Sequence, residues 1–141
     1  MLTIKAYAKI NLSLEVLGKL ESGYHSIVSV MQTINLSDEI SYVPSNKLTI
    51  QSNTTSLDTP DNLALKAAAL LKEYTGYPGG VDIYLKKTIP TASGLGGGSS
   101  DAAATLNALN VLWNLNLSHG NLMAMASELG SDVPFFIHGG T

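Results

Sequence analysis

The stretch that decides the fold lies at residues 90–104 and reads PTASGLGGGSSDAAA. It places four glycines within five positions, then two serines, then alanines that favour a helix. Glycine permits positive φ and lets the backbone approach a ligand closely, because it has no Cβ. A helix that begins beside such a loop directs its free N–H groups at the same point. We call residues 90–100 the glycine loop, and the pattern predicts that it binds phosphate.

A simpler interpretation competes with this one, namely a flexible loop whose helix is capped by Ser100 or Asp101. The flanking segments favour phosphate binding, since an alternating strand precedes the loop and an amphipathic helix follows it. Two better-known loops do not fit. No Lys-Ser or Lys-Thr follows Gly98, which excludes a Walker A loop, and no register of the glycines reads G-x-G-x-x-G.

The other segments indicate an α+β domain. Alternating apolar residues predict strands over 10–17, with a similar run beginning at Leu2, and over 26–36, 40–43, 48–50 and 81–85. Helical spacing predicts a helix over 63–74, opened by Pro60 or Asp61 and ended by Gly76, one over 102–113, and a last helix from Ser118 to Gly130. Without any linker or repeat, we expect one domain, 1–141, with a mostly antiparallel sheet.

Composition narrows the function classes. The net charge is −3, so nothing favours nucleic acid or an anionic membrane as a partner. The chain has eight lysines and no arginine, so phosphate must be held by lysines and backbone N–H groups. The absence of cysteine excludes disulfides and zinc–thiolate sites. The alternating N-terminus is neither a signal peptide nor a membrane span, and we expect a cytoplasmic protein.

Three short strings add polar residues to this picture. Lys9 and Asn11 share one face of the first strand, where they can hold a hydroxyl or a carboxylate, or simply be solvated. Tyr24 and His25 follow Gly23 in a turn. Asp132 lies in the string GSDVP at 130–134, where it can cap a short helix that Pro134 opens.

The loop, with a proline, a short spacer and GLGGGSSDAA at a helix start, resembles the phosphate-binding loop of GHMP kinases, which bind ATP without a Walker motif. The resemblance implies a ribosomal protein S5 domain 2-like α+β fold and Mg²⁺ with the ATP. The metal ligands stay unassigned, because Asp101 adjoins the loop but can as easily cap the helix. The implied ATP-binding residues are Pro90, Ser93, Gly94, Leu95, Gly96, Gly97, Gly98, Ser99 and Ser100.

The strings AKINL at 8–12 and GSDVP at 130–134 resemble the first and third motifs of the same family. This resemblance implies that Asp132 accepts or orients the proton of the substrate hydroxyl. It implies that Lys9 keeps that carboxylate ionised and that Asn11 positions the hydroxyl.

The longer loop and the string Gly23-Tyr24-His25 resemble one branch of the family, whose small-molecule substrate is a CDP-linked methylerythritol. That branch transfers phosphate from ATP to the 2-hydroxyl, in non-mevalonate isoprenoid synthesis. The resemblance implies that Tyr24 stacks on the cytidine base and that His25 hydrogen-bonds the polar edge of the base. A GHMP kinase for another small alcohol, a noncatalytic nucleotide-binding fragment and a purely structural domain stay open as alternatives.

Family members carry a second domain of similar size after this point. The resemblance therefore implies that the chain is the N-terminal, ATP-binding half, and that the C-terminal domain is absent from it. The sequence stops just after the apolar stretch 133–137, as expected of a fragment. We expect the chain alone to be a poor catalyst, with an exposed apolar edge that favours a homodimer.

Overall fold

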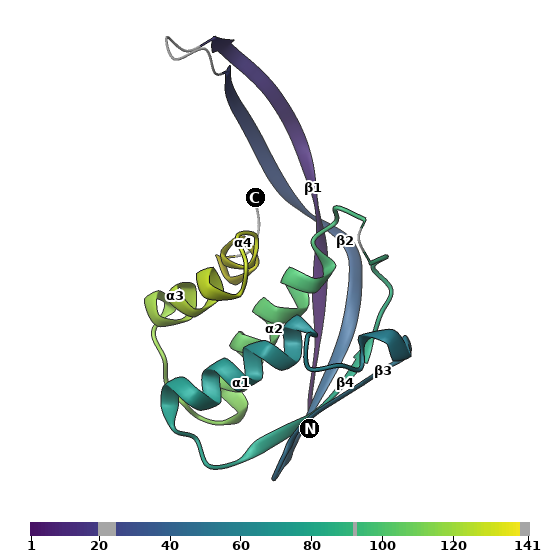
Figure 1. The fold of residues 1–141 in the computed structure, drawn as a ribbon, viewed down its shortest axis with the longest axis vertical. Helices are drawn as coiled ribbons and strands as arrows, with labels where there is room; N and C mark the ends of the chain where they lie inside the picture. Colours follow the sequence, from purple (N-terminus) through teal and green to yellow (C-terminus); the bar gives the residue numbers. More distant parts are fainter. Residues whose placement is uncertain (20–24, 92, 139–141) are drawn as a thin grey trace.

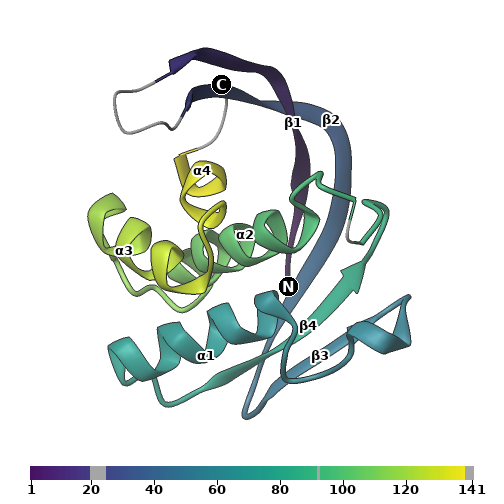
Figure 2. The ribbon, with the colours of Figure 1, turned by 45° about the horizontal axis from the view of Figure 1, so that its top comes forward.

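A long two-stranded ribbon forms one side of the sheet and extends beyond the helices (Figure 1). The computed structural model describes residues 1–19, 25–91 and 93–138, with the backbone alone at 12–19, 25–30 and 138. Strand β1 (Leu2–Lys19) pairs antiparallel with β2 (His25–Ser45). The register shifts at three places along this pair, and such irregularities bend a ribbon and increase its twist (Figure 2).

Two shorter strands complete the sheet, β3 (Leu48–Ser52) and β4 (Gly80–Lys86). The strand order is β1-β2-β4-β3, with β4 antiparallel to β2 and parallel to β3. The crossover between the parallel strands contains a short 3-10 helix (Thr55–Leu57) and helix α1 (Leu63–Thr75). This confirms the predicted α+β domain with a mostly antiparallel sheet.

The helices cover one face of the sheet (Figures 1 and 2). Helix α2 (Gly97–Leu112) is central and packs against α1, β1 and α4 (Val133–His138), while α3 (His119–Leu129) completes the layer. Within the described residues, no helix is both long and apolar enough to cross a bilayer.

The core lies between this helical layer and the sheet. Ile40 of β2, Ile83 of β4 and Leu106 of α2 are fully buried there. The Tyr42 hydroxyl lies 2.9 Å from the Thr105 hydroxyl, so a polar pair joins β2 to α2 inside the core. The position of α2 relative to the sheet is thus fixed by apolar burial and by one buried hydrogen bond.

The end of α2 that is remote from the glycine loop carries an aromatic stack. Trp113, the residue after the helix, is 5% exposed. Its ring stacks on Tyr77, with centroids 4.5 Å apart and an interplanar angle of 11°. The stack ties the segment after α1 to the end of α2.

Two helix termini agree with the sequence prediction. Gly76 ends α1 in the left-handed conformation, with φ of 71°. The Ser118 side chain caps α3 by accepting a hydrogen bond from the Asn121 N–H. Both termini depend on residues a few positions away along the chain, which explains why the sequence reveals them.

Other boundaries differ from the prediction. The strands expected at 26–36 and 40–43 are parts of the continuous strand β2, because β1 pairs with it along nearly its whole length. Helix α1 is capped by Asn62, whose side chain accepts from the Ala64 N–H, and not by Asp61 or by Pro60. Helix α2 begins inside the glycine run with Gly96 as its N-cap, so neither Ser100 nor Asp101 caps it, contrary to the simpler interpretation.

We predict that Leu106→Ala lowers the free energy of unfolding by about 3 kcal/mol, because it removes a fully buried side chain between α2 and the sheet and leaves a cavity. Urea denaturation followed by circular dichroism measures the change. Val111→Ala is the matched control on the same helix, since Val111 is 72% exposed, and it should change the value by less than about 0.5 kcal/mol. Equal losses in the two variants would contradict the assigned core.

Candidate active site

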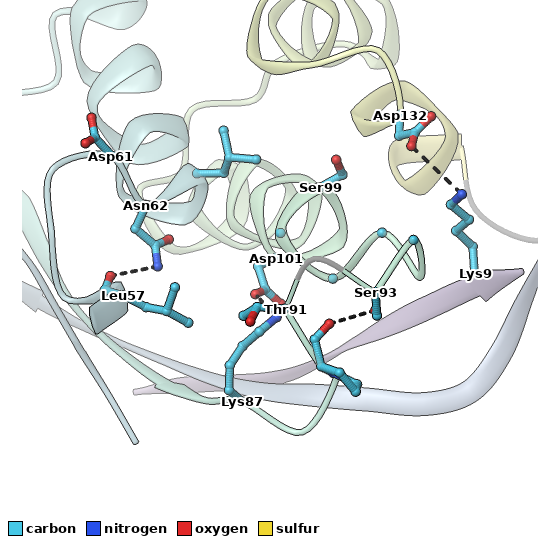
Figure 3. A pocket seen from close by; sticks show the side chains of 16 residues that line it. Lys9, Leu57, Asp61, Asn62, Lys87, Thr91, Ser93, Ser99, Asp101 and Asp132 are labelled. Carbon is cyan, nitrogen blue, oxygen red and sulfur yellow. Dashed lines mark hydrogen bonds and ion pairs between the residues drawn. The ribbon is translucent and has the colours of Figure 1, made fainter. Parts of the chain in front are cut away.

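A cavity of about 450 Å³ lies where the glycine loop meets the starts of α1 and α4 (Figure 3). Lys9 and Asp132 bound one end, and Leu57, Asp61 and Asn62 bound the other. Leu63 also contributes to the lining. The residues that the sequence predicted for the site and that line this cavity are Lys9, Pro90, Ser93, Gly94, Gly96, Gly97, Gly98, Ser99 and Asp132.

The glycine loop has a conformation that requires glycine. Gly94 and Gly96 have φ of 79° and 72°, in the left-handed region. A Cβ on Gly96 would also lie 2.8 Å from Cζ of Phe136, closer than carbon atoms approach. The Lys9 N–H donates to the Leu95 carbonyl at 2.8 Å, which ties the loop to β1. The loop therefore lies between β1, which bonds to it through Lys9, and α4, whose Phe136 packs against Gly96.

Helix α2 starts directly from this loop and presents its first turn to the cavity. Its N-cap, Gly96, contributes no side-chain hydrogen bond, and Gly97, Gly98 and Ser99 all line the cavity. The first N–H groups of a helix have no helical partner, and they lie at the positive end of the helix dipole. The arrangement can therefore hold an anion such as a phosphate chain.

Lys9 and Asp132 approach each other at one end of the cavity. Their Nζ and Oδ2 atoms are 4.0 Å apart (Figure 3). The Lys9 side chain is 8% exposed and that of Asp132 is 44% exposed. The pair places a largely buried ammonium group beside an accessible carboxylate at the cavity wall.

A second charged cluster, of which Figure 3 labels Lys87 and Asp101, lies beside the first turn of α2. The Lys87 Nζ is 2.6 Å from Oδ2 of Asp38 and 3.1 Å from Oδ2 of Asp101. Asp38 is fully buried and also accepts hydrogen bonds from the N–H groups of Thr88 and Ile89, at 2.7 and 2.8 Å. We call Asp38, Lys87 and Asp101 the buried triad.

The two carboxyl groups of the buried triad differ in their pKa. Burial acts to raise the pKa of Asp38, but contact with the Asp101 acid and hydrogen bonds from Lys87, Ile89 and Thr88 outweigh burial and hold this pKa below its usual value. Burial, aided by Asp38 and opposed by Lys87, raises the pKa of Asp101 to about 8. Near neutral pH, Asp38 therefore carries the charge and Asp101 the proton.

Some predicted site residues do not line the cavity. Leu95 takes part through its carbonyl group, and Ser100 is 3% exposed and contacts a groove between β1 and α2 instead. Asn11 is exposed and lies outside the cavity lining. Tyr24 lies outside the described residues, and at His25 the structure describes the backbone alone.

The described residues give no dedicated metal site. Among them, no three His, Cys, Asp or Glu side chains lie close enough together to hold a metal ion. Asp101, which adjoins the loop, is held by Lys87.

Sequence reasoning missed several residues of the cavity wall. Lys87 was recognised as the end of a strand, and Asp61 as a helix-start residue, but neither was assigned to the site. Leu57 and Leu63 carry no motif of their own. The signal that could have found some of them is closeness to a helix start, because the N-terminus of a helix favours the binding of anions.

The chain belongs to the GHMP kinase family. Residues 62–140, which include α1, the glycine loop and Asp132, match the model described as GHMP kinases N terminal domain. This confirms the family that the glycine loop resembles.

Named relatives agree with this assignment. The chain is 52% identical to a 4-diphosphocytidyl-2-C-methyl-D-erythritol kinase of Prochlorococcus marinus (strain MIT 9301), over 97% of the chain and 45% of the relative. It is 50% identical to the kinase of the same name from Bacillus cereus (strain B4264), over 99% of the chain and 50% of the relative.

A solved structure is similar over the same region. The crystal structure of 4-(cytidine 5'-diphospho)-2C-methyl-D-erythritol kinase superposes with a TM-score of 0.83 and 42% identity, covering 98% of this chain and 49% of that one. The chain thus spans about half the length of the proteins it matches.

We predict that Asp38→Asn lowers the free energy of unfolding at pH 7 by about 3 kcal/mol, because it removes the carboxylate nearest to the buried Lys87 ammonium group. Since the pKa of Asp38 is lowered in the folded state, its contribution is present above the usual value of 3.8 and is lost as the pH falls through the folded value. The free energies of unfolding of the variant and the parent, measured in urea, should therefore become equal at acidic pH.

The control for this variant is Glu39→Gln, which changes an exposed carboxylate on the same strand. It should leave the unfolding free energy within about 0.5 kcal/mol of the parent. An Asp38→Asn chain as stable as the control at pH 7 would show that the ion pair does not support the fold.

Proposed function

We propose that the chain is the ATP-binding half of a kinase that phosphorylates the 2-hydroxyl of 4-diphosphocytidyl-2-C-methyl-D-erythritol, in non-mevalonate isoprenoid synthesis. The observation that carries this proposal is a single cavity that joins the glycine loop to the Lys9–Asp132 pair. An anion cradle and an ionised carboxylate are what phosphoryl transfer to an alcohol requires. The names of the relatives supply the substrate.

The nucleotide is proposed to lie along the cavity with its triphosphate on the first turn of α2. The N–H groups of Gly97, Gly98 and Ser99 offer donors there, and the chain has no arginine to take their place. The side chains of Leu57 and Leu63 in the cavity lining offer an apolar surface for the base. This orientation directs the terminal phosphate toward Asp132.

The proposed roles of the polar pair come from the resemblance to the family, and the proximity of the two side chains supports them. Asp132 accepts or orients the proton of the attacking hydroxyl, and its exposure leaves it accessible to a substrate. Lys9 keeps the carboxylate ionised and offsets the negative charge at the transferred group. Asn11 is proposed to position the hydroxyl from its place two residues further along β1.

The CDP portion of the substrate is assigned to Tyr24 and His25, with the tyrosine ring stacked on the base and the imidazole at the polar edge of the base. Both assignments rest on the resemblance of the string Gly23-Tyr24-His25, which lies outside the residues whose side chains are described. Mg²⁺ is proposed to accompany ATP, held mainly by the phosphates, and no step is assigned to it.

The proposal includes a cytoplasmic location, where ATP is abundant, and self-association as a homodimer. A second candidate is a noncatalytic nucleotide-binding fragment, for which the glycine loop and the cavity would suffice. That candidate binds ATP without turnover. A GHMP kinase for another alcohol would instead accept plain alcohols as readily as CDP-linked ones.

We predict that Gly97→Ala weakens ATP binding by about tenfold or more in calorimetric titration. A Cβ at this position would lie 2.8 Å from the Lys87 Nζ and 2.9 Å from Cγ2 of Ile89, so the first turn of α2 or these two side chains would have to move. Gly120→Ala is the matched control, because its nearest neighbour would be the Ser118 hydroxyl at 3.8 Å. Unchanged affinity in Gly97→Ala would remove the triphosphate from this turn.

We predict that Asp132→Asn lowers kcat by about 100-fold or more and leaves the affinity for ATP unchanged, because the amide cannot accept the hydroxyl proton. The assay uses a protein of the relatives' full length that contains this chain, with the CDP-linked substrate. Ser131→Ala, an exposed neighbour, is the control. Near-normal turnover in Asp132→Asn would exclude the role given to this carboxylate.

A further inference from the structure

The buried triad has no part in the phosphoryl transfer proposed above, although it lies against the nucleotide site. Asp38 is fully buried, Asp101 is 3% exposed and the Lys87 side chain is 7% exposed. Two carboxylates and one ammonium group would leave a net charge of −1 in this buried place. Because an uncompensated buried charge is costly, one of the two carboxyl groups holds a proton.

The contacts show which carboxyl group it is. Asp38 accepts three hydrogen bonds, from the Lys87 Nζ and from the N–H groups of Thr88 and Ile89. Asp101 contacts Lys87 through Oδ2 at 3.1 Å, and its buried Oδ1 has no hydrogen-bond partner among the described residues. The three donors stabilise a negative charge on Asp38 better than one donor does on Asp101, so the proton belongs on Asp101. Burial, which raises the pKa of Asp101 to about 8, agrees with this assignment.

The position of Asp101 makes its charge matter for ligands. It is the fifth residue of α2, and both Asp101 and Lys87 contribute to the cavity wall (Figure 3). A Cβ on Gly97 would lie 2.8 Å from the Lys87 Nζ, so the triad stands directly behind the first turn of the helix. A charge there acts across protein interior, where electrostatic interactions are stronger than in water.

We propose that Asp101 is a positioning residue of the nucleotide site that must be uncharged for the first turn of α2 to hold a polyphosphate, so that binding at alkaline pH takes up one proton at Asp101. The inference rests on the proposed ATP site. With Asp101 neutral, Lys87 and Asp38 form a neutral pair and the helix N–H groups present an unopposed positive potential. Ionised Asp101 places a negative charge behind the same groups and repels the phosphates.

Other titratable groups face this region, and their effect on the pH dependence of binding must be distinguished from that of Asp101. Lys9 faces the cavity from β1, and Asp132 and Asp61 face it from the turns before α4 and α1. Tyr42 of β2 lies beneath Asp101 and is neutral throughout the tested range, because burial raises its pKa far above its usual value. Exchange of Asp101 alone, for an uncharged residue of the same shape, isolates its contribution.

The test is calorimetric titration of the 141-residue chain with ATP at pH 7.5 and 9.0, a range in which phosphate ionisation is essentially complete. With a pKa of about 8, the neutral fraction of Asp101 falls by about eightfold from pH 7.5 to pH 9.0, and the affinity for ATP should weaken by the same factor. Asp101→Asn mimics the neutral acid and should bind equally well at both values. Glu73→Gln, which also replaces a carboxyl group by an amide but at an exposed position of α1, should keep the eightfold change in affinity.

Titration at pH 9.0 in two buffers of different ionisation enthalpy adds a direct readout. The parent chain should take up close to one proton per ATP, and Asp101→Asn none. An Asp101→Asn chain that keeps the parent's pH dependence overturns the proposal. So does one that melts as a folded protein yet binds ATP about tenfold more weakly than the parent at pH 7.5.

Inorganic triphosphate, titrated in parallel, separates this inference from the proposed function. Triphosphate binding with the eightfold change, together with no ATP binding, would contradict the nucleotide site and support the role of Asp101. ATP binding that is independent of pH in the parent chain would support the nucleotide site and overturn the role of Asp101. A folded parent chain that binds neither ligand overturns both.

Discussion

The Asp38 carboxylate holds the segment on which the site depends. It collects the Lys87 ammonium group and the N–H groups of Thr88 and Ile89, and so fixes the path of the chain from β4 into the glycine loop. Because the carboxylate is fully buried, this segment cannot shift without leaving a charge or a donor unpaired. This ion pair therefore fixes the segment from which α2 starts, while apolar burial and the Tyr42–Thr105 hydrogen bond hold the helix itself against the sheet.

Lys9 supplies the second constraint, because it acts through both its backbone and its side chain. Its N–H donates to the Leu95 carbonyl, which fixes the glycine loop beside β1, and its ammonium group reaches Asp132 before α4. One residue thus relates the anion cradle to the candidate base. The cavity lies where β1, the glycine loop and the turn before α4 meet, and Lys9 of β1 contacts the other two segments.

Local patterns could be predicted from the sequence, and long-range pairings could not. The glycine loop, the end of α1 at Gly76 and the cap at Ser118 each depend on neighbouring residues, and the structure has them where expected. The continuity of β2 depends on pairing with β1, and the ion pair of Asp38 with Lys87 joins β2 to the segment that follows β4. Glycine's low helix propensity concealed the true start of α2. The pairing of Lys9 with Asp132 was expected from resemblance alone.

The aromatic stack at the far end of α2 has a consequence for spectroscopy. Trp113 is the single tryptophan of the chain, and it lies one residue beyond a 16-residue helix whose first turn faces the cavity. The rise of an α-helix separates the two ends by roughly 24 Å, too far for a ligand to touch the indole ring. Intrinsic tryptophan fluorescence therefore reports on the packing of α1 against α2, as a folding signal that is independent of cavity occupancy.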